Sequence, residues 1–327
     1  MHLDEFLAPK ILIVSGKGGV GKTTVAAALA VVAARHGHRV CIAEVDRKGT
    51  MPKLFGATDI DYKPREMSPG IYGMSIVPDE ALAEYLDVQY HMKRVSRVFT
   101  SSHFVDYITA TAPGLKDILV LGKIWYLEQG RTGPQFDTII LDAPAAGHML
   151  TFLSAPMGLS DAVRAGPLHR QADWLVQMLR DPRRARVHLV TLAEEMPISE
   201  TLETMEVLHN RIQIDTGPVF ANAVYPAHLT TADVKRMDEI LDDGALDELT
   251  TAAEAVGLRL EDEDLQALAG YARFITARRA IQVKHLRKLK QGTQDPIVEL
   301  PFLFTAGLAL PGVEEIADSI EEGVAKL

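Results

Sequence analysis

The stretch GKGGVGKTT, residues 16–24, decides the fold of this chain. It lies between a short apolar run, Lys10–Val14, and an alanine-rich run, Val25–Ala34, so it is typical of a turn from a strand into a helix. Glycines let such a turn point its backbone N–H groups at an anion, and the helix start adds its positive dipole. The spacing favours a phosphate-binding loop over a glycine turn that only packs closely. We expect the nucleotide to contact Gly16, Gly18, Gly19, Val20, Gly21, Lys22, Thr23 and Thr24.

Three side chains of this loop have distinct expected roles. Lys22 is placed to reach the β- and γ-phosphate oxygens, and the hydroxyl of Thr23 is placed to ligate Mg²⁺, so ATP and Mg²⁺ are the predicted cofactors. Lys17 cannot easily join the cradle of its own loop. Across a face-to-face dimer it could instead reach the partner's phosphates and neutralise charge there, as an arginine finger does. The sequence therefore predicts a catalytic Lys17 and ATP-dependent dimerisation.

Two aspartates stand where predicted strands end. Asp142 follows the apolar run Thr138–Leu141, where its carboxylate could hold a magnesium-bound water while the next turn senses the γ-phosphate. An aspartate that only caps that turn is the alternative. Asp46 follows Val40–Val45 and could orient the attacking water, with Glu44 as the competitor on the same face of the strand.

Apolar runs rich in β-branched residues alternate with helical patterns, which is typical of βαβ units around a buried parallel sheet. We predict one doubly wound, mostly parallel α/β domain over residues 1–327. Helical stretches at approximately 80–130 and 150–182 are expected to pack together as an insertion on one side of the sheet. The sheet should hold about seven strands or more, near Lys10–Val14, Val40–Val45, Ile71–Val77, Thr138–Leu141, Val187–Thr191, Pro218–Ala221 and Ile297–Leu300.

Composition and charge exclude several classes of protein. The 327 residues carry 34 basic and 44 acidic side chains, and a net charge of −10 disfavours nonspecific binding to nucleic acid or to an anionic membrane. The longest apolar run is about half of what a bilayer span needs, so we expect no direct membrane insertion. A start without the shape of a signal peptide and a single cysteine, Cys41, predict a cytoplasmic location.

Charge is unevenly spread over residues 231–290, which we expect to be helical. Twelve acidic and three basic residues lie between Thr231 and Ala269, whereas seven basic residues and no acidic one lie between Gly270 and Lys290. Opposite charges on neighbouring helices pair readily within one molecule. We therefore expect this acidic-then-basic segment to neutralise itself rather than to bind DNA.

With Lys17 in its second position, the loop resembles that of the deviant Walker A ATPases, in which this lysine acts in trans. Residues 142–148, DAPAAGH, are similar to the Asp-Thr-Ala-Pro-Thr-Gly-His switch of the arsenite-pump and tail-anchored-protein-targeting ATPases, the anion-transporting ATPase family. Asp142, Gly147 and His148 match without a gap, which implies a switch role for Gly147 and His148.

The first switch of that family is matched only in part. Asp46 matches the first aspartate of its Asp-Pro-Ala-His motif. Residues 47–49 depart from the motif, and Lys53 stands where the family commonly has a second aspartate. This basic switch could tune the hydrolysis rate or the choice of partner.

The resemblance extends over nearly the whole chain and also implies a pocket for the adenine base. Asn222 ends the strand Pro218–Ala221, and Pro301 and Phe302 follow the strand Ile297–Leu300. An amide can bond the edge of adenine, and an apolar loop can cover its face. The chain looks most similar to the actinobacterial-type paralogues, which often occur as two related subunits. A heterodimer is therefore as well supported as a homodimer.

The cysteine count narrows what such an ATPase could act on. Arsenite binding by thiolates, zinc bridging and an iron–sulfur cluster all need more than the lone thiol of Cys41. We predict a slow, dimer-dependent ATPase whose helical insertion moves over a hydrophobic client or a membrane partner. Met149, Met157 and Met178 would suit an adaptable groove, or could simply be core residues. The alternative is a nucleotide-gated regulatory or assembly ATPase without cargo.

Overall fold

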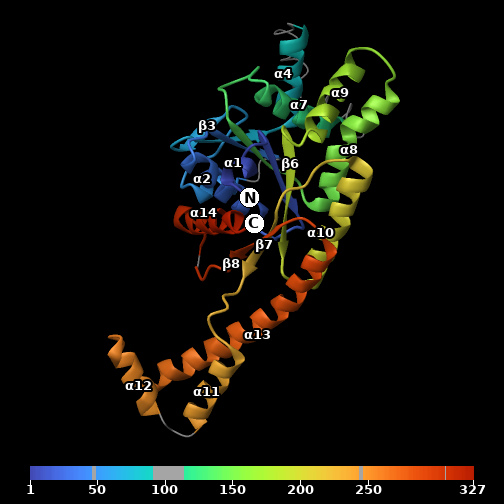
Figure 1. The fold of residues 1–327 in the computed structure, drawn as a ribbon. Coiled ribbons are helices and arrows are strands. Elements are labelled where there is room, and N and C mark those ends of the chain that lie inside the picture. The colour runs from blue at the N-terminus through green and yellow to red at the C-terminus, as the bar shows by residue number, and fades with distance from the viewer. Residues whose placement is uncertain (46–48, 91–113, 243–245, 306) are drawn as a thin grey trace.

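The computed structural model describes residues 1–45, 49–90, 114–242, 246–305 and 307–327 (Figure 1). Within these ranges, eight strands form one sheet in the order β3-β4-β2-β5-β1-β6-β7-β8, and only the β3–β4 pair is antiparallel. The strands are β1 (Ile11–Gly16), β2 (Val40–Val45), β3 (Arg65–Ser68), β4 (Ile71–Ile76), β5 (Thr138–Asp142), β6 (Ala185–Leu192), β7 (Val219–Val224) and β8 (Ile297–Pro301). The helices are α1 (Leu3–Phe6), α2 (Lys22–Arg35), α3 (Met51–Leu54), α4 (Pro78–Tyr90), α7 (Leu115–Glu128), α8 (Ala146–Ala162), α9 (Pro167–Arg180), α10 (Glu195–Val207) with the π-helical turn η1 (Leu208–Ile212), α11 (Thr231–Asp242), α12 (Leu246–Ala255), α13 (Asp262–Gly292) and α14 (Leu310–Ala325).

Helices cover both faces of the sheet. The alternation along β1 shows why, because Ile11 and Ile13 enter one apolar core while Leu12 and Val14 enter the other. The first core is closed mainly by α7, α8, α9 and α10, and the second by α2 and α14. The doubly wound, mostly parallel α/β class predicted from the sequence is confirmed.

Each of the seven predicted strands is present, and β3 is an addition. Its four residues, REMS, are exposed or half-buried and lack the apolar run that marks a buried strand. It is an antiparallel edge next to β4. A short polar edge of this kind discourages a further strand from adding to the sheet.

Helices α4, α7, α8 and α9, which we call the helical group, gather at one end of the sheet, at the top in Figure 1. They pack against one another, with α7 touching the other three. The predicted stretch 80–130 corresponds to α4 and α7, and residues 91–113 lie outside the described part. The predicted stretch 150–182 is divided into α8 and α9 by residues 163–166, where Gly166 has a φ of 101° that suits glycine.

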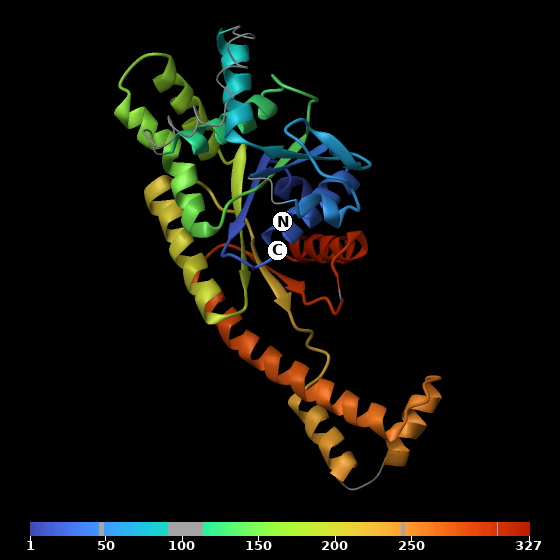
Figure 2. The same cartoon turned by 180° about the vertical axis from the view of Figure 1, so that it is seen from behind.

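The long helix α13 leads away from the body of the protein, and α11 and α12 lie at its far end (Figures 1 and 2). We call these three helices the arm. Arg273 of α13 pairs with Asp238 of α11 at 2.8 Å, as expected for an acidic stretch against a basic one. Farther along α13, however, Arg279 and Lys290 both pair with Glu299 of β8. The basic stretch therefore also anchors the arm to the sheet, which the charge pattern does not predict.

Candidate functional site

The phosphate loop lies between the end of β1 and the start of α2. Gly16 has no room for a side chain, because a Cβ there would collide with the carbonyl of Val190 on β6. Gly18 and Gly19 are different, since no heavy atom lies within 4 Å of the place where a Cβ would be. The loop is thus packed at its base and open at its tip, which suits a phosphate cradle. Val20 is buried in the loop, and Thr24 lies in the first turn of α2.

Thr23 and Asp142 meet at the predicted magnesium position. The Thr23 hydroxyl donates to Oδ2 of Asp142 at 2.7 Å, and Asp142 is fully buried at the end of β5. Glu44 of β2 is its neighbour in the sheet register. Hydroxyl and carboxylate oxygens are the ligands that Mg²⁺ prefers, so these residues fit the metal. Lys22 donates to the carbonyl of Lys17 at 3.0 Å and so lies along the loop.

The segment after Asp142 is tied to β1 and leads into α8. The amide of Ala143 donates to the carbonyl of Val14 at 3.0 Å, and the hydroxyl of Ser15 donates to the carbonyl of Pro144 at 2.7 Å. The predicted switch residues Gly147 and His148 follow in the first turn of α8, and both are exposed. Two hydrogen bonds therefore join the end of β1, where the phosphate loop begins, to the segment that leads into α8.

Lys17 has a partner that the sequence does not indicate. Its Nζ lies 2.8 Å from Oε2 of Glu200 on α10, and both side chains are about one-third exposed. The two residues are 183 positions apart, and Glu200 belongs to no motif. This contact holds the predicted trans-acting lysine within its own chain.

The first switch can be described only in part. Asp46, predicted to orient the attacking water, lies outside the described residues. Glu44, its competitor, is fully buried, and its Oε2 accepts a hydrogen bond from the Gly49 amide at 3.3 Å. Lys53 is exposed at the end of α3.

The predicted adenine pocket lies where β7 and β8 end. The amide of Asn222 donates to the carbonyl of Val20 at 2.9 Å and thereby links this pocket to the phosphate loop. Pro301 and Phe302 are half-buried, and the amide of Phe302 donates to the carbonyl of Val224 on β7 at 2.9 Å. The three predicted residues are thus held on adjacent strand ends.

A buried glutamine of the arm, which the sequence does not single out, fixes the same strand end. Gln282 accepts a hydrogen bond from the Tyr225 amide at 2.8 Å and donates one to the carbonyl of Ala223 at 2.9 Å. Ala223 has a φ of 54°, an unusual value for a residue with a side chain. The ring of Tyr225 in turn stacks on Phe302, with 4.6 Å between the centroids. The arm is therefore attached directly beside the predicted base pocket.

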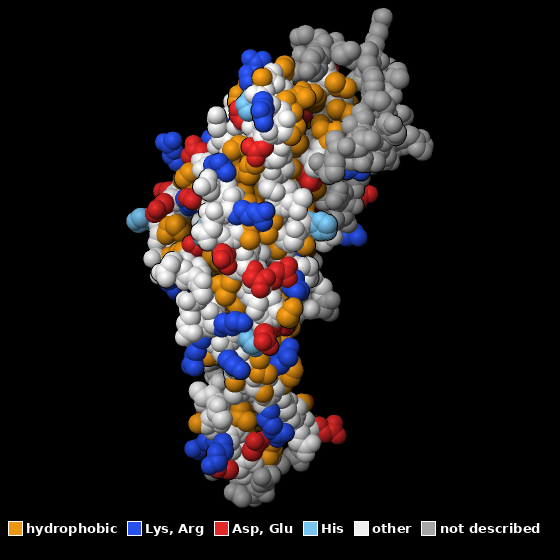
Figure 3. All heavy atoms as spheres, turned by 90° about the vertical axis from the view of Figure 1, so that its right-hand side faces the viewer, with side chains coloured by type: hydrophobic (Ala, Val, Ile, Leu, Met, Phe, Trp, Pro, Cys, Tyr) orange, Lys and Arg blue, Asp and Glu red, His pale blue; other side chains and the backbone are white. Residues whose placement is uncertain are grey.

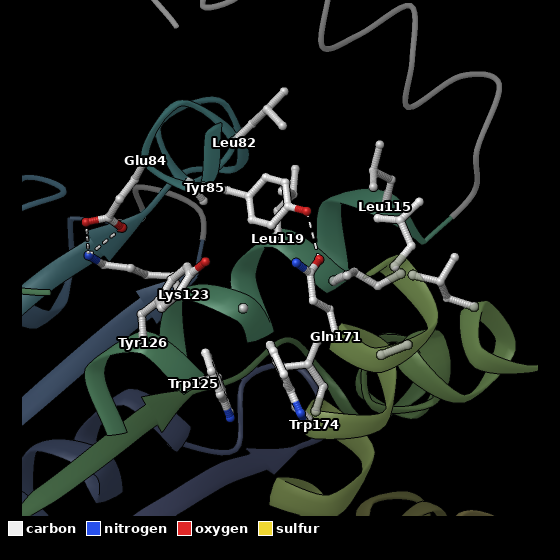
Figure 4. Close-up of a pocket in the computed structure, with 17 residues that line it drawn as sticks. Leu82, Glu84, Tyr85, Leu115, Leu119, Lys123, Trp125, Tyr126, Gln171 and Trp174 are labelled. Carbon is white, nitrogen blue, oxygen red and sulfur yellow. Dashed lines mark hydrogen bonds and ion pairs between the residues drawn. The ribbon is translucent and has the colours of Figure 1, made fainter. Parts of the chain in front are cut away.

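A cavity of about 250 Å³ lies within the helical group (Figure 4). Most of its lining is apolar, and Trp125 of α7 stacks against Trp174 of α9 at 5.1 Å. One polar corner holds the nearly buried Lys123, whose Nζ lies 2.7 Å from Oε2 of Glu84. Figure 3 shows apolar side chains gathered at this upper end of the molecule. The combination suits an apolar ligand with limited polar character.

Comparison with known proteins decides the family. A family model described as anion-transporting ATPase matches residues 9–171. ATPase BagA of Mycobacterium tuberculosis is 33% identical over 96% of this chain and 94% of its own length. This chain belongs to the anion-transporting ATPase family. The arsenical pump-driving ATPase of Acidiphilium multivorum is 27% identical over 61% of this chain and 37% of its own, and ATPase GET3C of Arabidopsis thaliana is 28% identical over 47% and 44%.

Among the described residues of this member of the anion-transporting ATPase family, no group of three or more His, Cys, Asp or Glu side chains is placed to hold a metal ion. Burial raises the pKa of the Cys41 thiol to about 12, which keeps it protonated in the core of the sheet. Among the helices that can be described, none combines the length and apolar character needed to cross a membrane.

Proposed function

We propose that this ATPase binds ATP with Mg²⁺, hydrolyses it slowly as a dimer, and uses its nucleotide state to move the helical group over a hydrophobic client or a membrane partner. Family membership supports the ATPase activity. The partner copy would be a second copy of this chain or a related subunit. A reducing, ATP-rich compartment such as the cytoplasm would suit the lone thiol of Cys41.

The phosphate loop supports nucleotide binding through residues with separate tasks. A bound Mg²⁺ would neutralise charge on the β- and γ-phosphates as the bond to the leaving group breaks. Thr23 would ligate that metal directly, and Asp142 would hold one of its waters. Lys22 would leave the carbonyl of Lys17 and turn to the phosphate oxygens. Asp46 would orient the attacking water, and Asn222, Pro301 and Phe302 would hold the base.

The Lys17–Glu200 ion pair bears on the dimer requirement. To reach the phosphates of a partner copy, Lys17 must leave Glu200. An ion pair between side chains that are about one-third exposed contributes only about 0.2–1 kcal/mol. Breaking it therefore costs little compared with the attraction of the Lys17 ammonium group to a triphosphate. The trans role thus agrees with a weak contact that can be exchanged.

The observation that carries the client proposal is the course of α8. Its first turn holds the predicted switch residues Gly147 and His148, and near its other end Leu159 lines the apolar cavity. A helix of 17 residues transmits a displacement over about 25 Å. A shift of the switch segment when the γ-phosphate binds or leaves would therefore move one wall of the cavity.

A regulatory or assembly ATPase without cargo is the second candidate. The exposed arm favours it, because such an output needs a surface outside the cavity. In that case the cavity would be a packing defect of the helical group, and no apolar peptide would alter hydrolysis.

A cavity-filling variant separates the two candidates. Gly122 lines the cavity, and a Cβ added there meets no heavy atom within 4 Å, so Gly122→Leu should fill the space without disturbing the fold. Gly158→Leu on α8 is the matched control, since that glycine also has open space but does not line the cavity.

The measurement is the binding of a synthetic apolar helical peptide to the ATP-bound protein, together with peptide-stimulated hydrolysis. We expect Gly122→Leu to weaken peptide binding about tenfold through lost apolar contact, with basal hydrolysis unchanged. If the unmodified protein neither binds the peptide nor responds to it, the client proposal is wrong and the regulatory one is favoured.

A further inference from the structure

The arm exposes several large apolar side chains to solvent. Helix α13 presents Tyr271, Phe274 and Ile281 to solvent, and the last two are 51% and 54% exposed. With the exposed Ala267, these residues are spaced at i, i+4, i+7 and i+14, so they lie on one face of the helix. We call them the α13 stripe.

The α13 stripe is not the face that attaches the arm to the rest of the chain. The attachment uses Leu265, Ala272 and Ile275, which are buried, together with Leu286 and Leu289 nearer the body. These lie on the side that contacts α11, α10 and β7. Helix α13 thus has two apolar faces, and the second is only partly covered, because Phe274 and Tyr271 touch Tyr225 and Phe304 yet stay 51% and 38% exposed.

Three of the charged side chains of α13 lie at nearly matching distances from Phe274. Asp264 and Glu263 lie 10 and 11 residues before Phe274, and Lys284 lies 10 residues after it. All three are exposed. The first turn of the helix is therefore acidic and the second half basic, at matching distances from the centre of the stripe.

We propose that the α13 stripe is an interface with a second copy of this chain, in which the two α13 helices lie antiparallel with Phe274 near the two-fold axis. In a two-fold interface, residue i meets residue j while j meets i, so one surface must complement itself. With Phe274 on the axis, Ile281 of each copy faces Ala267 of the other, a large side chain against a small one. Lys284 of each copy then lies level with Asp264 of the other and one residue from its Glu263.

A second copy fits this surface better than a foreign partner does. An acidic partner would be repelled by the first turn of α13, and a basic partner by the second half, whereas an antiparallel copy satisfies both. The stripe also adjoins the predicted base pocket, because Phe274 contacts Tyr225 and Tyr271 contacts Phe304, at 5.9 Å and 5.7 Å between ring centroids. Pairing of the arms would thus bring the predicted base pockets of the two copies near each other.

This inference rests on the dimer of the proposed function. It adds the location of a contact that persists without nucleotide. The arms are predicted to hold two copies together without nucleotide, while Lys17 acts only when ATP is bound. The two claims can therefore fail separately.

A cysteine at the axis gives the sharpest test. In the full chain, Phe274→Cys should form a disulfide-linked dimer on mild oxidation, because a residue near a two-fold axis lies close to its own copy. Cys41 is buried and cannot compete. Val256→Cys is the matched control, since Val256 is 74% exposed near the tip of the arm but lies off the stripe. Equal cross-linking of the two variants would overturn the proposal.

A charge exchange tests the antiparallel orientation. Glu263→Lys and Lys284→Glu should each weaken the nucleotide-free dimer severalfold in sedimentation experiments, and the double variant should restore it. Phe274→Asp should weaken it at least about tenfold. A nucleotide-free chain that is monomeric throughout would overturn the arm interface. In that case, a loss of ATP hydrolysis in Lys17→Ala would still support the trans role of Lys17. The arm interface and the trans role can therefore be tested separately.

Discussion

Around the phosphate loop, the side chains predicted to act on the nucleotide are bound by atoms of the same chain. Thr23 is held by Asp142, Asn222 by the carbonyl of Val20, and Lys17 by Glu200. Along the arm the arrangement is reversed, because Phe274 and Ile281 face solvent. The first region thus has its polar groups paired within one copy, whereas the second leaves apolar side chains exposed, as the proposed contact with another copy requires. Gln282 joins the two regions, because its side chain extends from the arm and forms hydrogen bonds with the strand end beside the predicted base pocket.

The largest effect should come from removing the Lys17 side chain. This change affects the phosphate loop and leaves the arm untouched, so it tests the first region alone. If Lys17 acts in trans, Lys17→Ala should lower hydrolysis by roughly 10³ or more, as the loss of an arginine finger does, with little change in nucleotide affinity of the monomer. The arm contact should be unaffected. The measurements are steady-state hydrolysis, nucleotide binding and sedimentation, with exposed Lys63→Ala as the matched control. Equal loss of hydrolysis and affinity would contradict the trans role.

The next effect concerns the stability of the sheet rather than the arm. His188 on β6 is fully buried between Phe6 and Phe220, and desolvation lowers its pKa from 6.5 to about 4. As pH falls from 6.5 to about 4, the unfolded chain takes up a proton at this residue and the folded chain does not. The folded protein should therefore lose up to about 3 kcal/mol of unfolding free energy over this window.

Denaturant titrations across that pH range check the loss. His188→Asn can still donate to the Pro218 carbonyl that His188 now contacts, but it does not titrate, so it should flatten the pH dependence. His228→Asn, an exposed control, should leave the dependence in place. An unchanged slope in His188→Asn would mean that other groups carry the effect.

The link between the regions should have an intermediate effect. Gln282→Leu leaves the Tyr225 amide and the Ala223 carbonyl without their side-chain partner, which should cost about 2 kcal/mol of unfolding free energy. ATP affinity should also fall severalfold, because the strand end that carries Asn222 loosens. Gln266→Leu, exposed on the same helix, is the control. Loss of stability with unchanged ATP affinity would show that the arm and the base pocket are energetically separate.

The fold was accessible from the sequence because its decisive signals are local. The run from Lys10 to Ala34 contains a strand, a glycine turn and a helix in continuous order, and buried parallel strands appear as apolar runs. β3 has no such run, because an edge strand need not be apolar on both faces. The break at Gly166 between α8 and α9 also has no periodic signal strong enough to mark it.

The arrangement of some candidate site residues was also accessible from the sequence, while their roles stay predictions. Thr23 and Asp142 follow from a loop and a strand end, which a parallel sheet brings to one edge. Glu200 and Gln282 have no motif, since their roles depend on helices that pack across the sheet more than 50 residues from their partners. The pairing of Arg279 and Lys290 with Glu299 is likewise a tertiary outcome, invisible in a count of charges.

The smallest effect should come from Glu200, and it tests whether this side chain withholds Lys17 from the phosphates of a partner copy. Glu200→Gln keeps the size of the side chain and removes its charge, so Lys17 should be released for the partner's phosphates at a gain of about 0.5 kcal/mol, or roughly twofold in hydrolysis at low protein concentration. Added salt screens the same contact and should reduce the difference between the variant and the unmodified protein. Glu203→Gln, on the same helix, is the control. A fall in hydrolysis instead would mean that Glu200 positions Lys17 for the reaction rather than withholding it, and Lys17 would then belong to its own nucleotide site.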